Sequence, residues 1–286
     1  MTSSAPGPPH ASLINGLNHI PLPPVQDFVS KFDNLLPEGS SIPSSLGTTR
    51  FYDCSPRSTS SARRVMMLHG GGTPAVAFSS LARQLNKSRN HVVTYDLWGH
   101  GPFSSPLETH APALMHPRPL KLLSYLRWTS AHIMGFSIGR SIAARFTAVH
   151  PHMVESRTLL SLAGLLREKD RGWWERLSMD GHVFRPRKER SAAKNGMKER
   201  VRAGAVDSVT VETWQRENHG GHVASWLHAT YKVLTESDVR VLVLVGSEDG
   251  VFPEEMLRRE LGGGAGHGIV GSHFENVERL VEEFWN

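Results

Sequence analysis

A single serine, Ser137, lies between two glycines in the stretch HIMGFSIGRS, which begins at His132. The apolar residues before Gly135 predict a buried strand, and the residues after Gly139 have the spacing of a helix. A sharp strand-to-helix turn lifts a serine hydroxyl above a sheet, and small residues two positions before and after it let the turn close. The pattern therefore predicts that Ser137 is a nucleophile, with the amide of Ile138 facing the oxyanion of an acyl transfer.

A glycine loop, His69–Gly72, follows an apolar run that predicts a strand over 63–70. Acyl transfer needs two N–H donors aimed at the oxyanion, and removing one donor slows the reaction by about 10²–10³-fold. Glycines bring backbone amides close to a substrate because no side chain intervenes. We expect the amide of Gly71 to be the second donor, with Gly72 as the reserve donor and a substrate contact. We expect His69 to support the loop rather than to transfer protons.

A serine hydroxyl is a weak nucleophile until a general base accepts its proton and a third group orients that base. The run VLVLVGSEDGVFP places Glu248 and Asp249 directly after an apolar stretch that predicts a buried strand. Two histidines, His267 and His273, follow nearer the C-terminus. The sequence thus offers two acids and two bases for a serine triad.

Short apolar runs alternate with amphipathic helical patterns along most of the chain. The expected strands, some with the turn that follows them, cover 48–55, 63–70, 91–101, 130–137, 156–164 and 238–246. The expected helices cover 78–88, 117–129, 138–151 and 274–285. This alternation predicts an α/β fold with a mostly parallel central sheet and helices on both faces.

Residues 165–237 interrupt the alternation with a long polar stretch that contains helical segments. Open parallel sheets carry their sites at the carboxyl ends of the strands, so we expect 165–237 to form a helical cap or lid there. The core then comprises 48–164 and 238–286. Residues 1–47, rich in Pro and Ser, are expected to form an N-terminal arm of loop with one short amphipathic helix.

Three aromatic residues are candidates for an apolar substrate pocket. Trp173 and Trp174 lie in the expected cap, where they either line the pocket or pack the core of the lid. Phe136, beside the nucleophile, either faces the pocket or is buried in the core. The glycine-rich stretch 261–273 is expected to contain the last strand.

Five motifs occur in order along the chain: HGGG after a strand, DLWGHG, GFSIG, VGSEDGVFP and GSHFENVERLVEEF. In this order they resemble the α/β-hydrolase superfamily, from about residue 48 to the end of the chain. Within it, the sequence is similar to capped esterases, lipases and related small-molecule hydrolases. The resemblance implies that DLWGHG is a structural turn near the floor of the site, with Asp96 and His100 holding the loop by hydrogen bonds.

The resemblance implies a triad in the order serine, acid, histidine: Ser137, Asp249 and His273. The glycine and proline around Asp249 match the acid motif of the family and favour this residue over Glu248. His273 directly precedes the final amphipathic helix, as the catalytic histidine of the family does. His267, in a Gly-His pair, is the rival base.

Two further residues bear on the resemblance. Arg140, close after the nucleophile, departs from the family, in which this position is commonly small. A serine at the turn argues against epoxide hydrolysis and dehalogenation, for which members of this superfamily use an aspartate. We therefore expect Ser137 to form an acyl-enzyme.

Composition narrows the remaining classes of protein. The chain has 286 residues, 39% hydrophobic and 21% charged, which is typical of a globular protein. No run of about 18 apolar residues predicts a membrane span, and a single cysteine, Cys54, with no signal-peptide pattern, predicts a cytoplasmic protein. Much of the net charge of +5 lies in 185–202, interpreted as solvated surface rather than a nucleic-acid site. His219 and His222 have no third ligand at metal-binding spacing, so neither a metal nor a cofactor is expected.

These features predict a serine hydrolase that cleaves a carboxylic ester, lactone or thioester of a small, moderately apolar substrate. The same triad can instead serve acyl transfer, C–C bond cleavage or lyase chemistry, since a fold does not fix the reaction. A non-catalytic protein that binds a small ligand on the same scaffold is the second alternative. The oligomeric state stays open, with a homodimer as one option.

Overall fold

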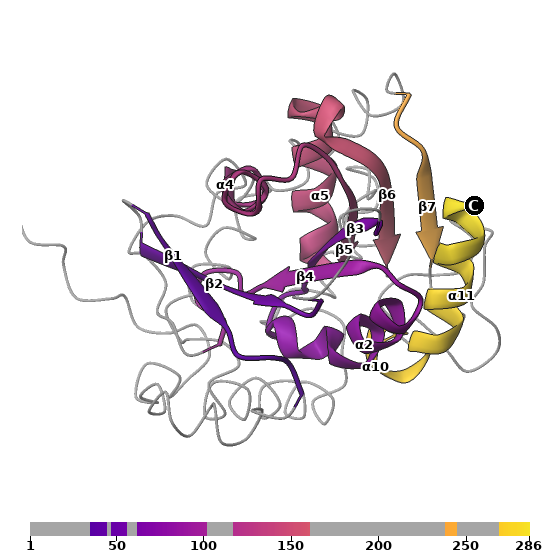
Figure 1. The fold of residues 1–286 in the computed structure, drawn as a ribbon, viewed down its shortest axis with the longest axis horizontal. Helices are drawn as coiled ribbons and strands as arrows, with labels where there is room; N and C mark the ends of the chain where they lie inside the picture. The colour runs from indigo at the N-terminus through magenta and orange to yellow at the C-terminus, as the bar shows by residue number, and fades with distance from the viewer. Residues whose placement is uncertain (1–34, 45–46, 56–61, 102–116, 161–237, 245–268) are drawn as a thin grey trace, which may run out of the picture.

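Seven strands form one mixed sheet in the residues that a computed structural model of the chain describes: 35–44, 47–55, 62–101, 117–160, 238–244 and 269–286 (Figure 1). The strands are β1 (Ser40–Ser44), β2 (Gly47–Asp53), β3 (Arg64–Leu68), β4 (His91–Tyr95), β5 (Ala131–Phe136), β6 (Val154–Leu160) and β7 (Val241–Leu244). Their order across the sheet is β1-β2-β4-β3-β5-β6-β7. The pairs β1–β2 and β2–β4 are antiparallel, and the other four pairs are parallel. The predicted mostly parallel sheet is confirmed.

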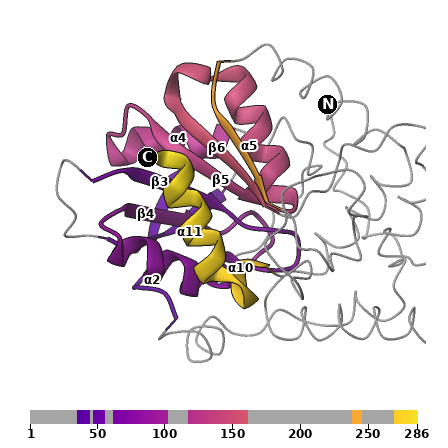
Figure 2. The same cartoon turned by 90° about the vertical axis from the view of Figure 1, so that its right-hand side faces the viewer.

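Helices cover both faces of this sheet (Figure 2). They are η1 (Ala75–Phe78), α2 (Ser79–Lys87), α4 (Pro117–Leu126), α5 (Ile138–Val149), η2 (Pro151–Met153), α10 (Ile269–Ser272) and α11 (Phe274–Trp285). Helices α2, α10 and α11 pack on one face, and α4 and α5 pack on the other. In the part of the chain described here, no helix has the length and apolar character needed to cross a membrane.

The two faces of the sheet bury two separate sets of apolar side chains. Along β3, Val65 and Met67 belong to one set, and Met66 and Leu68 belong to the other. This alternation follows from the geometry of a strand, in which successive side chains point to opposite faces. Because helices cover both faces, the strand is apolar throughout, which explains its strong signal in the sequence.

Helix α11 carries one apolar stripe that fixes it to the sheet. Val277, Val281 and Trp285 follow at intervals of four residues, and all three are buried. Residues at this spacing lie on one face of a helix. Helix α11 packs beside α2 and begins directly after His273, so its packing places that histidine.

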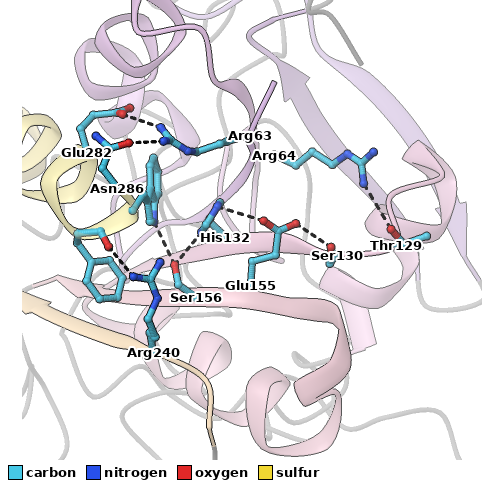
Figure 3. A network of polar contacts seen from close by, with 12 residues as sticks. Arg63, Arg64, Thr129, Ser130, His132, Glu155, Ser156, Arg240, Glu282 and Asn286 are labelled. Atoms are coloured by element: carbon cyan, nitrogen blue, oxygen red, sulfur yellow. Dashed lines mark hydrogen bonds and ion pairs between the residues drawn. The ribbon is translucent and has the colours of Figure 1, made fainter. Parts of the chain in front are cut away.

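The C-terminal end of α11 is held near the amino ends of β5 and β6 (Figure 3). Trp285 Nε1 donates to Ser156 Oγ at 3.0 Å, and the Trp285 ring lies 4.6 Å from the ring of His132. His132 Nδ1 lies 2.8 Å from Ser156 Oγ, and its Nε2 lies 3.2 Å from Glu155 Oε2. Burial above all lowers the pKa of His132 to about 4, so the ring is neutral near pH 7.

Two arginines complete this anchor. Arg63 pairs with Glu282 at 2.9 Å and also donates to the Asn286 side chain. Arg240 donates to the backbone oxygen of Phe284 at 3.0 Å (Figure 3). Arg63 directly precedes β3, and Arg240 directly precedes β7. Both arginines therefore join the C-terminal end of α11 to the edge of the sheet where the parallel strands begin. We call these contacts the amino-edge network. It joins the C-terminal end of α11 to residues at the amino ends of the strands, and its members are Arg63, His132, Glu155, Ser156, Arg240, Glu282, Phe284, Trp285 and Asn286.

Two local expectations differ from the structure. Ser40–Ser44, placed in the arm of loop, form β1, because they pair with β2 through a register that no local pattern in the sequence reveals. Ile269–Ser272, placed in the glycine-rich last strand, form the short helix α10 instead. The expected cap, 165–237, and residues 261–268 lie outside the described residues, as does most of the arm, 1–34.

Candidate active site

Ser137 occupies a sharp turn between β5 and α5. It has φ 52° and ψ −115°, a conformation that residues other than glycine rarely adopt. Its own N–H donates to Leu160 O at 3.0 Å, which ties the turn to the end of β6. Backbone strain of this kind persists where the surrounding structure imposes it, often at functional sites.

The two glycines around Ser137 are required by close contacts. A Cβ atom on Gly139 would lie 2.1 Å from Leu68 O and 2.5 Å from His69 O, both of them backbone atoms. A Cβ on Gly135 would lie 2.4 Å from the Cα of Arg140. Gly135 therefore lets the turn fold back so that α5 begins close to the end of β5, and Gly139 lets the start of α5 approach the end of β3. Both contacts fit the tight turn that the sequence predicted.

The glycine loop after β3 packs directly against the serine turn. Leu68 pairs with Gly135 in the register between β3 and β5, so the two strands end side by side. A Cβ on Gly70 would lie 2.8 Å from the Phe136 ring and 3.1 Å from the Cβ of Ser137. The backbone of the loop is therefore in the immediate surroundings of the serine side chain.

Two histidines join this loop to the loop after β4 by crossed hydrogen bonds. His69 Nε2 accepts the N–H of Leu97 at 2.8 Å, and His100 Nε2 accepts the N–H of Gly72 at 2.9 Å. Their Nδ1 atoms lie 2.8 Å from Gly70 O and 3.0 Å from Trp98 O, respectively. Both side chains are fully buried, with ring centroids 4.8 Å apart. We call His69 and His100 the crossed histidine pair.

An accepting ring nitrogen carries no proton, which fixes the state of both rings. Each Nδ1 therefore carries the proton and donates it to the backbone oxygen beside it. Burial, with smaller contributions from His100 and Arg118, lowers the pKa of His69 well below its usual value. The sequence predicted supporting roles for His69 and His100 but not that each would bind the loop of the other.

Asp96 braces the same region from the end of β4. It accepts hydrogen bonds from the Tyr52 hydroxyl at 2.9 Å and from the N–H of Ala75 at 2.8 Å. Burial raises the pKa of Asp96 to about 6 even though these two bonds lower it. Gly101, with φ +65°, approaches so closely that a Cβ there would lie 2.7 Å from Asp96 Oδ2. The expected structural role of Asp96 therefore fits its contacts.

Ile138, whose amide is expected to be one of the two oxyanion donors, lies at the start of α5. Ile138 is the first residue of α5, so its amide belongs to the N–H groups that have no partner within a helix. The positive end of the helix dipole lies at the same place. Arg140, the residue that departs from the family pattern, lies two residues after Ile138 in α5 and is fully buried.

His273 is the N-cap residue of α11, directly before the helix begins at Phe274. Its Nδ1 is 2.8 Å from Ser272 Oγ, and its side chain is partly exposed. Val270 and Val277, which flank it in sequence, pack in the same apolar cluster as Phe136. The structure therefore places His273 on the same side of the sheet as α2, with its Nδ1 hydrogen-bonded to Ser272 and not to Ser137.

The remaining predicted site residues divide into two groups. Phe136 is only 5% exposed, and its ring lies edge-to-face on Phe78 with centroids 6.4 Å apart, so it packs in the core as well as against Gly70. Asp249, His267, Trp173 and Trp174 lie outside the described residues. Among the residues that are described, no group of three or more His, Cys, Asp or Glu side chains is placed to hold a metal ion.

Comparisons with known proteins agree with the fold. A family model described as alpha/beta hydrolase fold matches residues 63–260. A serine hydrolase-like protein of Dictyostelium discoideum is 30% identical over 118 residues, which cover 38% of this chain and 32% of that protein. The chain spans about a third of the length of the curated relatives it matches.

Two solved structures share the fold. A hydrolase from Pseudomonas aeruginosa PA01 is 20% identical, with a TM-score of 0.66 over 87% of this chain and 98% of that chain. A carboxylesterase from Bacillus subtilis is 17% identical, with a TM-score of 0.63 over 91% and 96% of the two chains. At these identities the likeness establishes the architecture, while the reaction depends on the site.

Proposed function

Since this chain belongs to the α/β-hydrolase fold family, we propose that it is a serine hydrolase of esterase type. Its substrate is a carboxylic ester, lactone or thioester of a small, moderately apolar molecule. One observation carries the proposal: Ser137 has a strained, positive φ at a turn that Gly135 allows to fold back tightly and that Gly139 allows to pack against the end of β3. This geometry presents a serine side chain beside backbone amides, as acyl transfer requires.

In the proposed reaction, Ser137 Oγ attacks the carbonyl carbon while His273 accepts the hydroxyl proton. The tetrahedral oxyanion receives hydrogen bonds from the amides of Gly71 and Ile138. His273 then returns the proton to the leaving alcohol or thiol, and an acyl-enzyme remains. Water, deprotonated by the same histidine, attacks the acyl carbon, and the histidine returns that proton to Ser137 Oγ as the acid is released. Asp249 is assigned to orient His273 and to stabilise its charged form.

The contacts of the glycine loop support Gly71 over Gly72 as the donor. The N–H of Gly72 is already donated to His100 Nε2 at 2.9 Å. A donor engaged in that bond is not directed toward an oxyanion. Gly71 lies between Gly72 and Gly70, and the backbone at Gly70 is so close to Ser137 that a Cβ on Gly70 would lie 3.1 Å from the Cβ of Ser137.

The position of His273 at the start of α11, and its hydrogen bond to Ser272, support its role as the base. The hydrogen bond between Nδ1 and Ser272 Oγ orients the ring and leaves Nε2 for Ser137. In a serine triad, Nδ1 bonds to the orienting group and Nε2 takes the proton. The proposal assigns that orienting role to Asp249, so Asp249 replaces or joins Ser272 at Nδ1.

A fluorophosphonate probe tests the proposal, because it reacts with activated serines. The wild-type protein is expected to label stoichiometrically at Ser137, and Ser137→Ala is expected to remain unlabelled with its fold retained. Ser141→Ala is the matched control, since Ser141 follows in α5 and is buried. A wild-type protein that does not label would favour the ligand-binding alternative.

The identity of the base is tested separately. His273→Ala is expected to lose ester hydrolysis by several orders of magnitude, whereas His267→Ala is expected to keep it. An inactive His267→Ala beside an active His273→Ala would transfer the role of base to His267. A parallel screen of short esters, long esters, lactones and thioesters would define the substrate class.

A further inference from the structure

We propose that the crossed histidine pair, His69 and His100, holds the two peptide planes on either side of Gly71 and thereby aims its amide at the oxyanion. The inference rests on the proposed function, because it concerns the oxyanion site of that reaction. It assigns both histidines as positioning residues, since neither ring contacts the reacting atoms. Each acts through one peptide plane of the glycine loop.

The first plane joins Gly70 to Gly71. In a trans peptide, the carbonyl of one residue and the N–H of the next point in opposite directions in one plane. Gly70 O is held by His69 Nδ1–H at 2.8 Å and by the Thr73 hydroxyl at 3.2 Å. Because these two donors fix the direction of Gly70 O, they also fix the opposite direction of the Gly71 N–H.

The second plane joins Gly71 to Gly72. Its N–H is held by His100 Nε2 at 2.9 Å, and Gly72 itself has φ 70°. Glycine peptides rotate more freely than others because no Cβ restricts them. Fixing both neighbouring planes removes that freedom from Gly71, which preorganises its amide before substrate binds.

The pair works as a unit because each histidine is held by the loop of the other. His69 belongs to the glycine loop but accepts the N–H of Leu97 from the loop after β4, and His100 belongs to that second loop but accepts the N–H of Gly72. A change in either ring therefore releases contacts on both loops. Because both histidines act on the Gly71 amide, the effects of substituting His69 and His100 on kcat are expected to be strongly non-additive.

The surroundings keep both rings in the neutral form that these contacts need. A protonated ring would place an N–H against the N–H that Nε2 now accepts. Arg118, from α4, disfavours a charge on His69, and the carboxylate of Asp96 bonds to Tyr52 and the N–H of Ala75. Full burial of both rings adds to the cost of a charge.

His100→Leu and His100→Gln are the variants that test the assignment. Leucine cannot accept the Gly72 N–H, whereas the glutamine side-chain oxygen can. With a p-nitrophenyl ester, His100→Leu is expected to lower kcat by about 10²-fold, the loss typical for one oxyanion donor, and to change KM little. His100→Gln is expected to recover most of that loss. All rates are divided by the active fraction from active-site titration, so that unfolded protein does not count.

A second readout separates positioning from a general structural role. A thionoester places sulfur where the oxyanion forms, and sulfur is a weak acceptor of N–H bonds. The wild-type preference for ester over thionoester is therefore expected to shrink by at least tenfold in His100→Leu and to return in His100→Gln. A merely structural histidine would lower both rates equally and leave the ratio unchanged.

Thr73→Val gives a milder test that avoids a change in the buried rings. It removes one of the two donors to Gly70 O, and we expect a several-fold lower kcat and a smaller ester preference. Thr94→Val is the matched control, because it removes a similar hydroxyl-to-carbonyl bond, Thr94 to Met67 O at 3.0 Å, inside the sheet. We expect Thr94→Val to lower stability without changing the ester-to-thionoester ratio.

The outcomes distinguish this inference from the function on which it rests. A wild-type protein that hydrolyses no ester and forms no adduct at Ser137 overturns the proposed function, and this assignment with it. An active wild type whose His100→Leu and Thr73→Val variants keep their kcat and their ester preference overturns the positioning role alone. Loss in His100→Leu with recovery in His100→Gln supports it.

Discussion

The sheet has a carboxyl edge, where the parallel strands end, and an amino edge, where they begin. Both edges contain buried histidines, but the partners of these histidines differ in kind. At the carboxyl edge, His69 and His100 bond to backbone groups of two loops. In the amino-edge network, His132 faces the side chains of Ser156, Glu155 and Trp285 (Figure 3). Backbone partners fix the direction of individual amides, whereas side-chain partners join whole elements together.

The backbone conformations at the two edges also differ. Arg89 and Arg127, in the turns that lead into β4 and β5, have positive φ, but Ser137 at the carboxyl edge combines φ 52° with ψ −115° and lies between glycines whose Cβ atoms would overlap backbone. The amino-edge network instead binds the end of α11 through Arg63, Glu282 and Trp285. We infer that the carboxyl edge favours chemistry at some cost in stability, and that the amino edge favours stability. Changes at the two edges should therefore separate activity from folding.

Ser137→Ala should have the largest effect on activity. Loss of the nucleophile is expected to lower ester hydrolysis by at least about 10³-fold. The free energy of unfolding in urea should fall little, since the side chain makes few stabilising contacts at a strained position. A variant that unfolds at much lower urea would contradict the separation between the two edges.

Gly139→Ala should have the largest effect on stability at the carboxyl edge. Its Cβ would lie 2.1 Å from Leu68 O, a backbone atom that moves only with β3, so we expect a loss of about 1–3 kcal/mol together with lower activity. Gly39→Ala is the matched control. Its Cβ would meet the flexible end of the Arg50 side chain at 2.3 Å, which can move away, so both properties should change little.

Two buried groups, His132 at the amino edge and Asp96 at the carboxyl edge, should respond to acid in opposite directions. The pKa of His132 is lowered from 6.5 to about 4, so the unfolded chain binds more protons between these values and stability falls as pH decreases from 6.5 to 4. The pKa of Asp96 is raised from 3.8 to about 6, so its contribution to stability increases as pH decreases from 6 to 3.8. The two contributions oppose each other in the wild type.

Two variants separate these contributions in urea unfolding between pH 4 and 7. His132→Gln should lose less stability in acid than the wild type, because the His132 contribution is removed while that of Asp96 stays. Asp96→Asn should lose more stability in acid than the wild type, because the opposing Asp96 contribution is removed. Parallel pH profiles in both variants and the wild type would show that neither group has the environment described here.

Arg279→Ala should have the smallest effect. Arg279 and Glu283 form an exposed ion pair at 2.7 Å on α11, one turn apart. Such pairs contribute about 0.3–0.5 kcal/mol, and salt screens them. Thermal unfolding should shift slightly, and ester hydrolysis should stay at the wild-type rate. A large loss of activity would mean that α11 positions His273 less rigidly than its buried stripe indicates.

The parts of the fold that the sequence predicted are those with a local cause. The apolar run before Gly135 and the turn glycines around Ser137 reflect burial and close packing, which leave a pattern in neighbouring residues. β1 was missed because its sequence, SSIPS, has no alternation of apolar and polar residues, although it pairs with the strand that begins only three residues later. Antiparallel pairing with β2, not propensity, decides that strand.

The crossed histidine pair shows the same limit at the site. HGGG and DLWGHG each indicated a loop, and supporting hydrogen bonds were expected in both. The exchange of partners between them depends on β3 and β4 lying side by side in the sheet. Such a contact across 28 residues leaves no spacing that sequence reasoning can detect.

The most direct test of the account is a search for an acyl-enzyme. The protein would be mixed with a p-nitrophenyl ester, quenched in acid within milliseconds, digested and mapped by mass spectrometry. The account predicts one acyl group, on the peptide that contains Ser137, and none in Ser137→Ala. Hydrolysis without any acyl adduct, or an adduct on another residue that persists in Ser137→Ala, would contradict it.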